Sequence, residues 1–502
     1  MGWKSKLCTV LLLLSVLLAV NASLDYTEKD PELKQCKDQC RHQRSFDQQQ
    51  RQHCEQRCDD YIKQKRKQEK QQREGGEGGT SFNKYDQEQQ QQQQQQNPYL
   101  FEDEDFETEI ETEQGRVQVL QKFTEKSNLL RGIENFRIGV LVTKPHSFIA
   151  PHHLDADCVL FVFQGRPTIT MVRGEKRESH DLERGDILRV PAGTPVYMIN
   201  RDENEKLIIV ELLHPVSLPD HFEAFYEGGG EKPESFFKAF SREVVEAAFK
   251  TETDELEKLF RQQRQGRIVR ASKQQIEKLS HPTRHGREGF WPFHGDEPST
   301  PISTSSKTGP FNLFKKHPSQ SNQHGRLFEA DSDDFEQLKD LDLRVSFANI
   351  TRGSMTALQF NSRSTKIAFV LDGEGFFEMA CPHLASQESS QQQTSDRPRY
   401  QNVRGDLRRG AVFVVPAGHP LTTIASRKGN LQVICFEMNA KGNVKFPLAG
   451  KKNVVSQFER EAKELAFGVP VTEVDRIFNK QTGEFFLEGP NNQEQGRLWS
   501  VV

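Results

Sequence analysis

Apolar residues in this 502-residue chain gather in two blocks that polar sequence separates. In the first block, residues 138–142 and 159–163 are short runs rich in β-branched and aromatic residues, and Gly165 follows as a turn. The tract Gly-Asp-Ile-Leu-Arg-Val-Pro-Ala-Gly at 185–193 precedes a further apolar run at 207–213. Short runs of this kind, punctuated by Gly and Pro, predict a β-rich domain.

The second block repeats the same order. Residues 354–360 and 367–371 indicate strands, Gly373 follows as the turn, and Gly-Ala-Val-Phe-Val-Val-Pro-Ala-Gly at 410–418 precedes an apolar run at 431–436. A repeat of this length is a whole domain and not a solenoid unit. The sequence therefore predicts a mainly β protein with two tandem jelly-roll barrels, because barrel closure leaves no unpaired sheet edge.

The two copies differ in length at one place. Gly373 follows Gly165 by 208 residues, whereas Pro416 follows Pro191 by 225, so the second copy has 17 additional residues between these landmarks. The polar run at 386–399 is the natural location for them, as a loop at the barrel rim.

Each barrel is expected to end in a helical arm. Residues 234–260 and 454–478 place apolar side chains at helical spacing, with a break at Pro470. Two interpretations stay open. The apolar stripes either pack onto their own barrel or dock onto a neighbouring copy of the chain, and both can hold at once.

Polar segments flank and separate these domains. Residues 1–22 have the basic start, short apolar run and small residues before the cleavage point that are typical of a secretory signal peptide. The apolar run is shorter than the roughly 20 residues of a membrane span, so no stable membrane association is expected. In order, we expect the signal peptide at 1–22, a four-cysteine segment at 23–74, a disordered Gln-rich and acidic linker at 75–115, the first barrel with its arm at 116–280, a flexible linker at 281–325, the second barrel with its arm at 326–480 and a C-terminal tail at 481–502. The acidic block at 102–113 is interpreted as a solvated part of the first linker.

Composition narrows the classes of function. The net charge of -4 gives no basic field that would attract nucleic acid. The sequence contains no nucleophile elbow, phosphate-binding loop or Cys-His-Asn set, so we do not expect an enzyme. Gln and Arg are abundant, whereas Met (6) and Cys (8) are few. A nitrogen-rich composition of this kind is consistent with storage.

The motifs resemble a known family. Gly-x5-Pro-x-Gly occurs twice and resembles the cupin superfamily, and the doubled barrel with helical arms is similar to the two-barrel cupins of seeds. Four stretches resemble vicilins, the 7S globulins: Asn-Pro-Tyr at 97–99, Pro-His-His-Leu-Asp-Ala-Asp at 151–157, Pro-Ala-Gly-Thr-Pro-Val-Tyr at 191–197 and Lys-His-Pro-Ser-Gln-Ser-Asn at 316–322. The resemblance covers about residues 97–490. It implies a non-enzymatic seed storage protein that forms homotrimers through its arms, passes through the endoplasmic reticulum to the protein storage vacuole, and is recognised by IgE as an allergen.

The same resemblance shows which ligands of a cupin metal site have been lost. Metal-using cupins hold a divalent ion with three imidazoles and one carboxylate. In the first barrel these positions are His152, Leu154, Cys158 and Val196. In the second barrel they are Asn361, Arg363, Lys366 and Leu421. We therefore expect no cofactor and no cupin metal site. His152 is the single candidate ligand that remains, and His153 cannot easily join it because adjacent strand residues point to opposite faces.

Four clustered cysteines, Cys36, Cys40, Cys54 and Cys58, form two Cys-x3-Cys pairs. A spacing of four puts both members of a pair on one helix face. Two antiparallel helices could then be joined by Cys36–Cys58 and Cys40–Cys54, one of the three connectivities that four cysteines allow. Residues 34–73 hold 12 basic and 6 acidic side chains.

The paired pattern resembles the small helical hairpins at the front of some vicilins, which implies an antimicrobial or protease-inhibitor peptide. The alternative is a propeptide that assists sorting and is cut away. The other cysteines of the mature chain are Cys158, Cys381 and Cys435, and the first and last of these lie in strand-like apolar runs and are expected to be buried free thiols. The sequon Asn349-Ile350-Thr351 is expected to lie at a turn and to carry a glycan.

Overall fold

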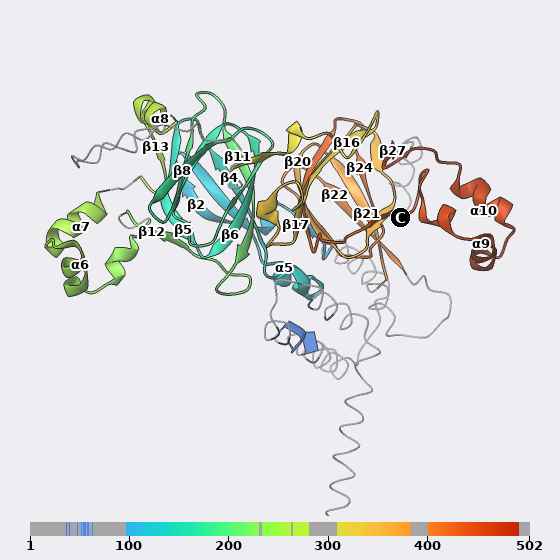
Figure 1. Cartoon of the computed structure of the whole chain (residues 1–502), viewed down its shortest axis with the longest axis horizontal. Coiled ribbons are helices and arrows are strands. Elements are labelled where there is room, and N and C mark those ends of the chain that lie inside the picture. Colours follow the sequence, from blue (N-terminus) through green and yellow to red (C-terminus); the bar gives the residue numbers. More distant parts are fainter. Residues whose placement is uncertain are drawn as a thin grey trace, which may run out of the picture.

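Two β-barrels lie side by side along the long axis of the molecule, with a helical hairpin at each end (Figure 1). The computed structural model describes residues 97–229, 233–262, 265–280, 309–382 and 400–490, together with single positions between 37 and 63. The predicted signal peptide at 1–22, the predicted rim loop at 386–399 and the end of the predicted tail lie outside the described residues.

The first barrel consists of two antiparallel sheets. One has the order β14-β9-β6-β11-β4-β3-β2, and the other has the order β12-β5-β10-β7-β8 with β13 on β5. The strands are β2 (Phe106–Thr112), β3 (Gly115–Leu120), β4 (Arg137–Thr143), β5 (Ser147–Leu154), β6 (Ala156–Gln164), β7 (Pro167–Arg173), β8 (Lys176–Asp181), β9 (Asp186–Val190), β10 (Val196–Asn200), β11 (Leu207–Pro215), β12 (Ala224–Tyr226), β13 (Ile268–Arg270) and β14 (Phe311–Asn312). Between β3 and β4 lie the short helices α5 (Phe123–Lys126) and η2 (Asn128–Ile133).

The second barrel repeats this plan. Its sheets have the orders β1-β23-β20-β25-β17-β16-β15 and β22-β21-β24-β18-β27, with β19 on β24 and β26 on β19. The strands are β1 (Leu100–Phe101), β15 (Gln320–Asn322), β16 (Gly325–Ala330), β17 (Leu343–Ile350), β18 (Ser354–Thr356), β19 (Gln359–Asn361), β20 (Thr365–Asp372), β21 (Gly375–Cys381), β22 (Gln401–Leu407), β23 (Val412–Val415), β24 (Leu421–Ala425), β25 (Leu431–Met438), β26 (Lys445–Pro447) and β27 (Phe486–Glu488). The predicted pair of β-barrels is confirmed.

The barrels pack back to back through one sheet of each. Strands β6 and β20 are buried on both faces, one face toward the barrel lumen and the other toward the neighbouring barrel, so their sequences are nearly continuous apolar runs. At the contact, the ring of Phe314 from η4 (Leu313–Lys315) lies 4.8 Å from Phe347 and 6.2 Å from Phe161, measured between centroids. A single apolar cluster therefore contains residues from both barrels.

Each barrel also completes a sheet of the other. β1 precedes the first barrel in sequence but pairs with β23 of the second, with Leu100 opposite Phe413. β14 leads into the second barrel but pairs with β9 of the first. Gly185 permits this approach, because a Cβ at that position would lie 2.5 Å from the ring of Phe314. The two strand exchanges link the barrels in addition to their apolar contact.

The helical arms form where the apolar spacing predicts them. The first contains η3 (Phe236–Ala239), α6 (Arg242–Phe249) and α7 (Thr253–Arg261), and the second contains η7 (Val454–Gln457), α9 (Arg460–Phe467) and α10 (Val471–Phe478). A further helix, α8 (Lys273–Ser280), follows the first arm and contacts β10. Both arms project beyond the barrels in Figure 1.

Three predicted domain boundaries are wrong. The linker expected at 75–115 contains β1, and its acidic block forms η1 (Asp103–Asp105) and β2, because backbone pairing of β2 with β3 does not require apolar side chains on an edge strand. The linker expected at 281–325 contains β14 and β15, and the tail expected at 481–502 contains β27, which pairs with β18. Within the described part of the chain, no helix has the length and apolar character needed to span a membrane.

Candidate functional site

The lumen of the first barrel contains a cavity of about 360 Å³. Its walls are largely apolar and come from both sheets. The aliphatic and sulfur-containing members of the lining are Ile110, Val117, Val119, Leu141, Ile149, Leu154, Cys158, Leu160, Ile169, Val190, Val196, Met198 and Leu213. A volume and polarity of this kind are typical of a small-molecule site.

The four positions aligned with cupin metal ligands all line this cavity. They are His152, Leu154, Cys158 and Val196. A backbone carbonyl, that of Ala150, lies 2.8 Å from His152 Nδ1, and the His152 ring stacks obliquely on Tyr226 at 5.6 Å. Burial lowers the pKa of His152 and raises the pKa of Cys158 well above its usual value, so both side chains are neutral near pH 7.

The other polar residues near His152 face elsewhere. His153 stacks on Phe225 with ring centroids 4.9 Å apart, Asp155 accepts a hydrogen bond from the Glu223 amide, and Asp157 accepts hydrogen bonds from Arg189. No group of three or more His, Cys, Asp or Glu side chains in the described residues is arranged to hold a metal ion.

The strand register corrects the predicted ligand positions of the second barrel. Gly193 N donates to Leu154 O in the first barrel, and Gly418 N donates to Asn361 O in the second. Asn361 is therefore equivalent to Leu154, and Gln359 is equivalent to His152, so the positions assigned to Asn361 and Arg363 lie two residues too far along the chain. One of these two residues arises because Asn361 precedes Lys366 by five positions, whereas Leu154 precedes Cys158 by four.

An unpredicted carboxylate, Glu211, lies on the lumen face of β11 and lines the cavity. Gly139 stands opposite it on β4, and a Cβ there would lie 3.2 Å from Glu211 Oε2, so the glycine makes room for the carboxylate. Burial raises the pKa of Glu211 to about 7. The sequence gives one indication of this residue, because Glu211 is the single acidic residue in the apolar run at 207–213. The apolar run by itself predicts only a strand.

The lumen of the second barrel is filled by charged side chains. Glu437, fully buried on β25, lies 3.2 Å from the ammonium of Lys445 and 3.6 Å from that of Lys366. Arg344 approaches it at 3.7 Å, and Lys445 also pairs with Glu329. Burial alone would raise the pKa of Glu437, but the attraction of Lys445, Lys366 and Arg344 outweighs it and lowers the pKa to about 2.

The two lumens differ residue by residue at equivalent register positions. Cys158 faces Leu213 in the first barrel, and Lys366 faces Glu437 in the second. Ala224 pairs with Leu154, whereas Lys445 pairs with Asn361. By the same register, Val119 is equivalent to Glu329 and Glu211 is equivalent to Cys435. The cavity therefore exists in the first barrel because shorter, uncharged side chains stand where the second barrel has an ionic cluster.

Two further predicted sites lie away from the lumens. Asn349 is on β17, paired with both β16 and β25, so the sequon is at the end of a strand and the predicted turn is wrong. Its Oδ1 is buried and has no hydrogen-bond partner in the described part of the structure. The thiols of Cys158 and Cys435 are free and buried, as the sequence predicts, and so is that of Cys381.

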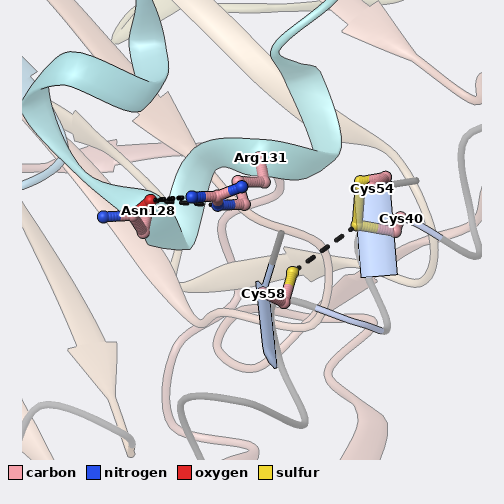
Figure 2. The surroundings of a disulfide bond; sticks show 5 residues. All are labelled: Cys40, Cys54, Cys58, Asn128 and Arg131. Carbon is pink, nitrogen blue, oxygen red and sulfur yellow. Dashed lines mark hydrogen bonds between the residues drawn. A yellow bond between two sulfur atoms is a disulfide. The ribbon is translucent and has the colours of Figure 1, made fainter. Parts of the chain in front are cut away.

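The predicted Cys40–Cys54 disulfide is present, and Figure 2 shows it with Cys58, Asn128 and Arg131. Cys58 Sγ lies 3.8 Å from Cys40 Sγ, and Cys58 is itself disulfide-bonded. The predicted partner, Cys36, lies outside the described residues. Lys37 and Asp59, two helical positions of this segment, form an ion pair of 2.7 Å.

Two tandem jelly-roll barrels with exchanged edge strands define a two-domain protein of the cupin type, and the comparisons with known proteins agree. The cupin family matches residues 100–256 and 311–475. Vicilin Jug r 6.0101 from Juglans regia is 56% identical over 99% of this chain and 100% of its own length. The chain belongs to the vicilins, the 7S seed globulins of the cupin family.

Two other relatives carry information on function. Vicilin-like antimicrobial peptides 2-1 from Macadamia integrifolia is 40% identical over 80% of this chain and 60% of its own length. The vicilin from Solanum melongena is 37% identical, with a TM-score of 0.71 over 80% of this chain and 100% of the other. Its crystal structure is described as revealing different anionic ligands in structurally similar pockets.

The ionic cluster predicts a non-additive pair of substitutions. Glu437→Leu should lower the free energy of unfolding by about 3–5 kcal/mol, because it leaves Lys366 charged and without its partner in the lumen. Adding Lys366→Cys, which restores the residue pair of the first barrel, should recover most of this loss. Chemical denaturation at pH 7 measures both effects, and simple additivity of the two substitutions would contradict the cluster.

Proposed function

We propose that this protein is a non-enzymatic nutrient reservoir that stores nitrogen and carbon in seeds. The observation that carries the proposal is the similarity to a vicilin over the full length of the chain. Of the eight positions that align with cupin metal ligands in the two barrels, only His152 still has the residue that a cupin metal site uses. The nitrogen-rich composition supports the same conclusion. The proposal includes passage through the secretory pathway to the storage vacuole, a glycan on Asn349 and recognition by IgE.

Abundance over time tests the reservoir function. Quantitative mass spectrometry through seed maturation and germination should show accumulation to a major fraction of seed protein, followed by rapid loss on germination. A low and steady level throughout both stages would instead indicate a binding or defence role.

We further propose a homotrimer formed through the arms. The arms share one internal design: Glu246 accepts hydrogen bonds from Arg242 and the Thr253 amide, and Glu464 accepts them from Arg460 and the Val471 amide. Each hairpin exposes apolar side chains at its end of the molecule, with Leu259 66% and Leu465 86% accessible. Two similar apolar ends on one chain suit head-to-tail contacts, which close into a ring.

Charged substitutions on each arm test this arrangement. Leu259→Glu and Leu465→Glu should each convert the trimer to monomer in light scattering, because each places an unpaired charge in an apolar contact. Leu218→Glu, at an exposed apolar residue outside the arms, is the matched control and should leave the trimer intact.

Mixing the two arm variants identifies the pairing. If the first arm binds the second arm of a neighbour, the mixture retains one intact contact and should form dimers, while each variant alone stays monomeric. Dimers of either variant alone would indicate like-with-like contacts and would contradict the ring.

A second function is favoured by the cysteine segment. A disulfide joins two helical positions, Cys40 and Cys54, and the surrounding residues 34–73 have 12 basic and 6 acidic side chains, a net charge of 12 - 6 = +6. We propose that this segment acts as an antimicrobial or protease-inhibitor peptide after release. The similarity to a macadamia protein named for such peptides supports the proposal.

The peptide proposal predicts that oxidised residues 24–74 permeabilise anionic vesicles or inhibit trypsin. The reduced and alkylated peptide has the same charge but no disulfide bond, so it should be less active in the same assay. Inactivity of the oxidised peptide in both assays would favour a propeptide role in sorting.

A further inference from the structure

We propose that the lumen of the first barrel binds a small, mainly apolar ligand that carries one ammonium group, with Glu211 as its counter-ion. This binding function goes beyond storage. It rests on the contrast between the two lumens and on the surroundings of Glu211.

The second barrel shows how this fold accommodates a carboxylate in its lumen. Glu437 is held between the ammonium groups of Lys445 and Lys366, at 3.2 and 3.6 Å. In the first barrel the positions of these two lysines are taken by Ala224 and Cys158, and both residues line the cavity. Glu211 stands at the position of Cys435, two residues along the strand from that of Glu437, so the first barrel has a lumenal carboxylate but no ammonium group at either lysine position.

The arginines of the cavity lining contact other groups. Arg137 donates to the carbonyls of Leu120 and Asp220, at 2.8 Å each. Arg267 lies over the ring of Tyr226, 4.9 Å from its centroid. Among the described residues, none makes a hydrogen bond or an ion pair to the Glu211 carboxylate.

The cavity also has the electrostatic character that a cation requires. Its lining contains five carboxylates and three permanent cations, which gives -5 + 3 = -2 with histidines neutral. The carboxylates are those of Glu107, Glu109, Glu125, Glu211 and Glu223, and the cations are Lys122, Arg137 and Arg267. Apolar walls around a charged pair strengthen its attraction relative to water. The two arginines would favour an anion instead, as described for the Solanum melongena vicilin, and the experiment distinguishes these ligands.

The affinity for a cation should depend on pH, because binding is linked to the protonation of Glu211. Because burial raises the pKa of Glu211 to about 7, the empty site is increasingly protonated below pH 7, and a cation must displace that proton. His221, which pairs with Glu223 at 2.9 Å, also lines the cavity, so the pH dependence that belongs to Glu211 is the part that Glu211→Gln removes. Burial lowers the pKa of His152 on β5 and raises those of Cys158 on β6 and Tyr226 on β12, while Arg137 on β4 and Arg267 beside β13 stay charged.

Calorimetric titration of the full chain with three probes of similar shape tests the proposal. At pH 8, benzylammonium should bind at least tenfold more tightly than benzyl alcohol, and benzoate should bind most weakly. The affinity for benzylammonium should fall toward tenfold per pH unit below pH 7, while that for benzyl alcohol should change little.

Two variants test whether the preference for benzylammonium depends on Glu211. Glu211→Gln keeps the shape of the side chain and should remove the preference for benzylammonium, whereas Glu223→Gln at the mouth should change the affinity less than twofold. Glu211→Gln removes a buried charge and should raise the melting temperature at pH 8, so a lowered melting temperature would identify misfolding as the cause of lost binding. No binding of benzylammonium, tighter binding of benzoate, or an unchanged preference in Glu211→Gln would each overturn the proposal.

Discussion

The apolar contact between the outer faces of the two barrels is the constraint on which the rest of the structure depends. Phe161, Phe314 and Phe347 fill the centre of this contact, and strands β6 and β20 are buried on both faces as a result. The exchange of β1 and β14 between the sheets reinforces it. Because the barrels are fixed back to back, their arms lie at opposite ends of the molecule, which is the geometry that a head-to-tail ring needs.

With the outer faces constrained in this way, the lumens have been free to diverge. One is filled by a network of Lys, Arg and Glu side chains, and the other keeps a cavity with a buried carboxylate, Glu211, to which no described residue makes an ion pair. Neither arrangement preserves the imidazole set of a metal-using cupin. The same fold thus combines a lumen whose charges pair with one another, a lumen with a cavity and two arms with exposed apolar side chains in one seed globulin.

Much of the fold could be predicted from sequence, because turn glycines, Pro-Ala-Gly tracts and apolar runs recur in the same order. The helical arms followed from their spacing, and the Cys40–Cys54 pair was one of the connectivities considered. Two edge strands were not predicted. β2 is acidic and is held by backbone pairing, which needs no apolar pattern. β14 belongs to a sheet formed mostly by residues more than 90 positions earlier in the chain. The role of Glu211 was also missed, because the orientation of one residue in an apolar strand depends on register, and the lack of a nearby cation depends on the whole lumen.

Hydrogen exchange after a single substitution tests the shared core most directly. Phe347→Ala removes a ring from β17 of the second barrel and should lower the free energy of unfolding by about 3–5 kcal/mol. If one core holds both barrels, exchange should accelerate to a similar degree in β20 of the second barrel and in β6 and β11 of the first. Acceleration confined to the second barrel would show that the barrels are stabilised independently and would contradict the account.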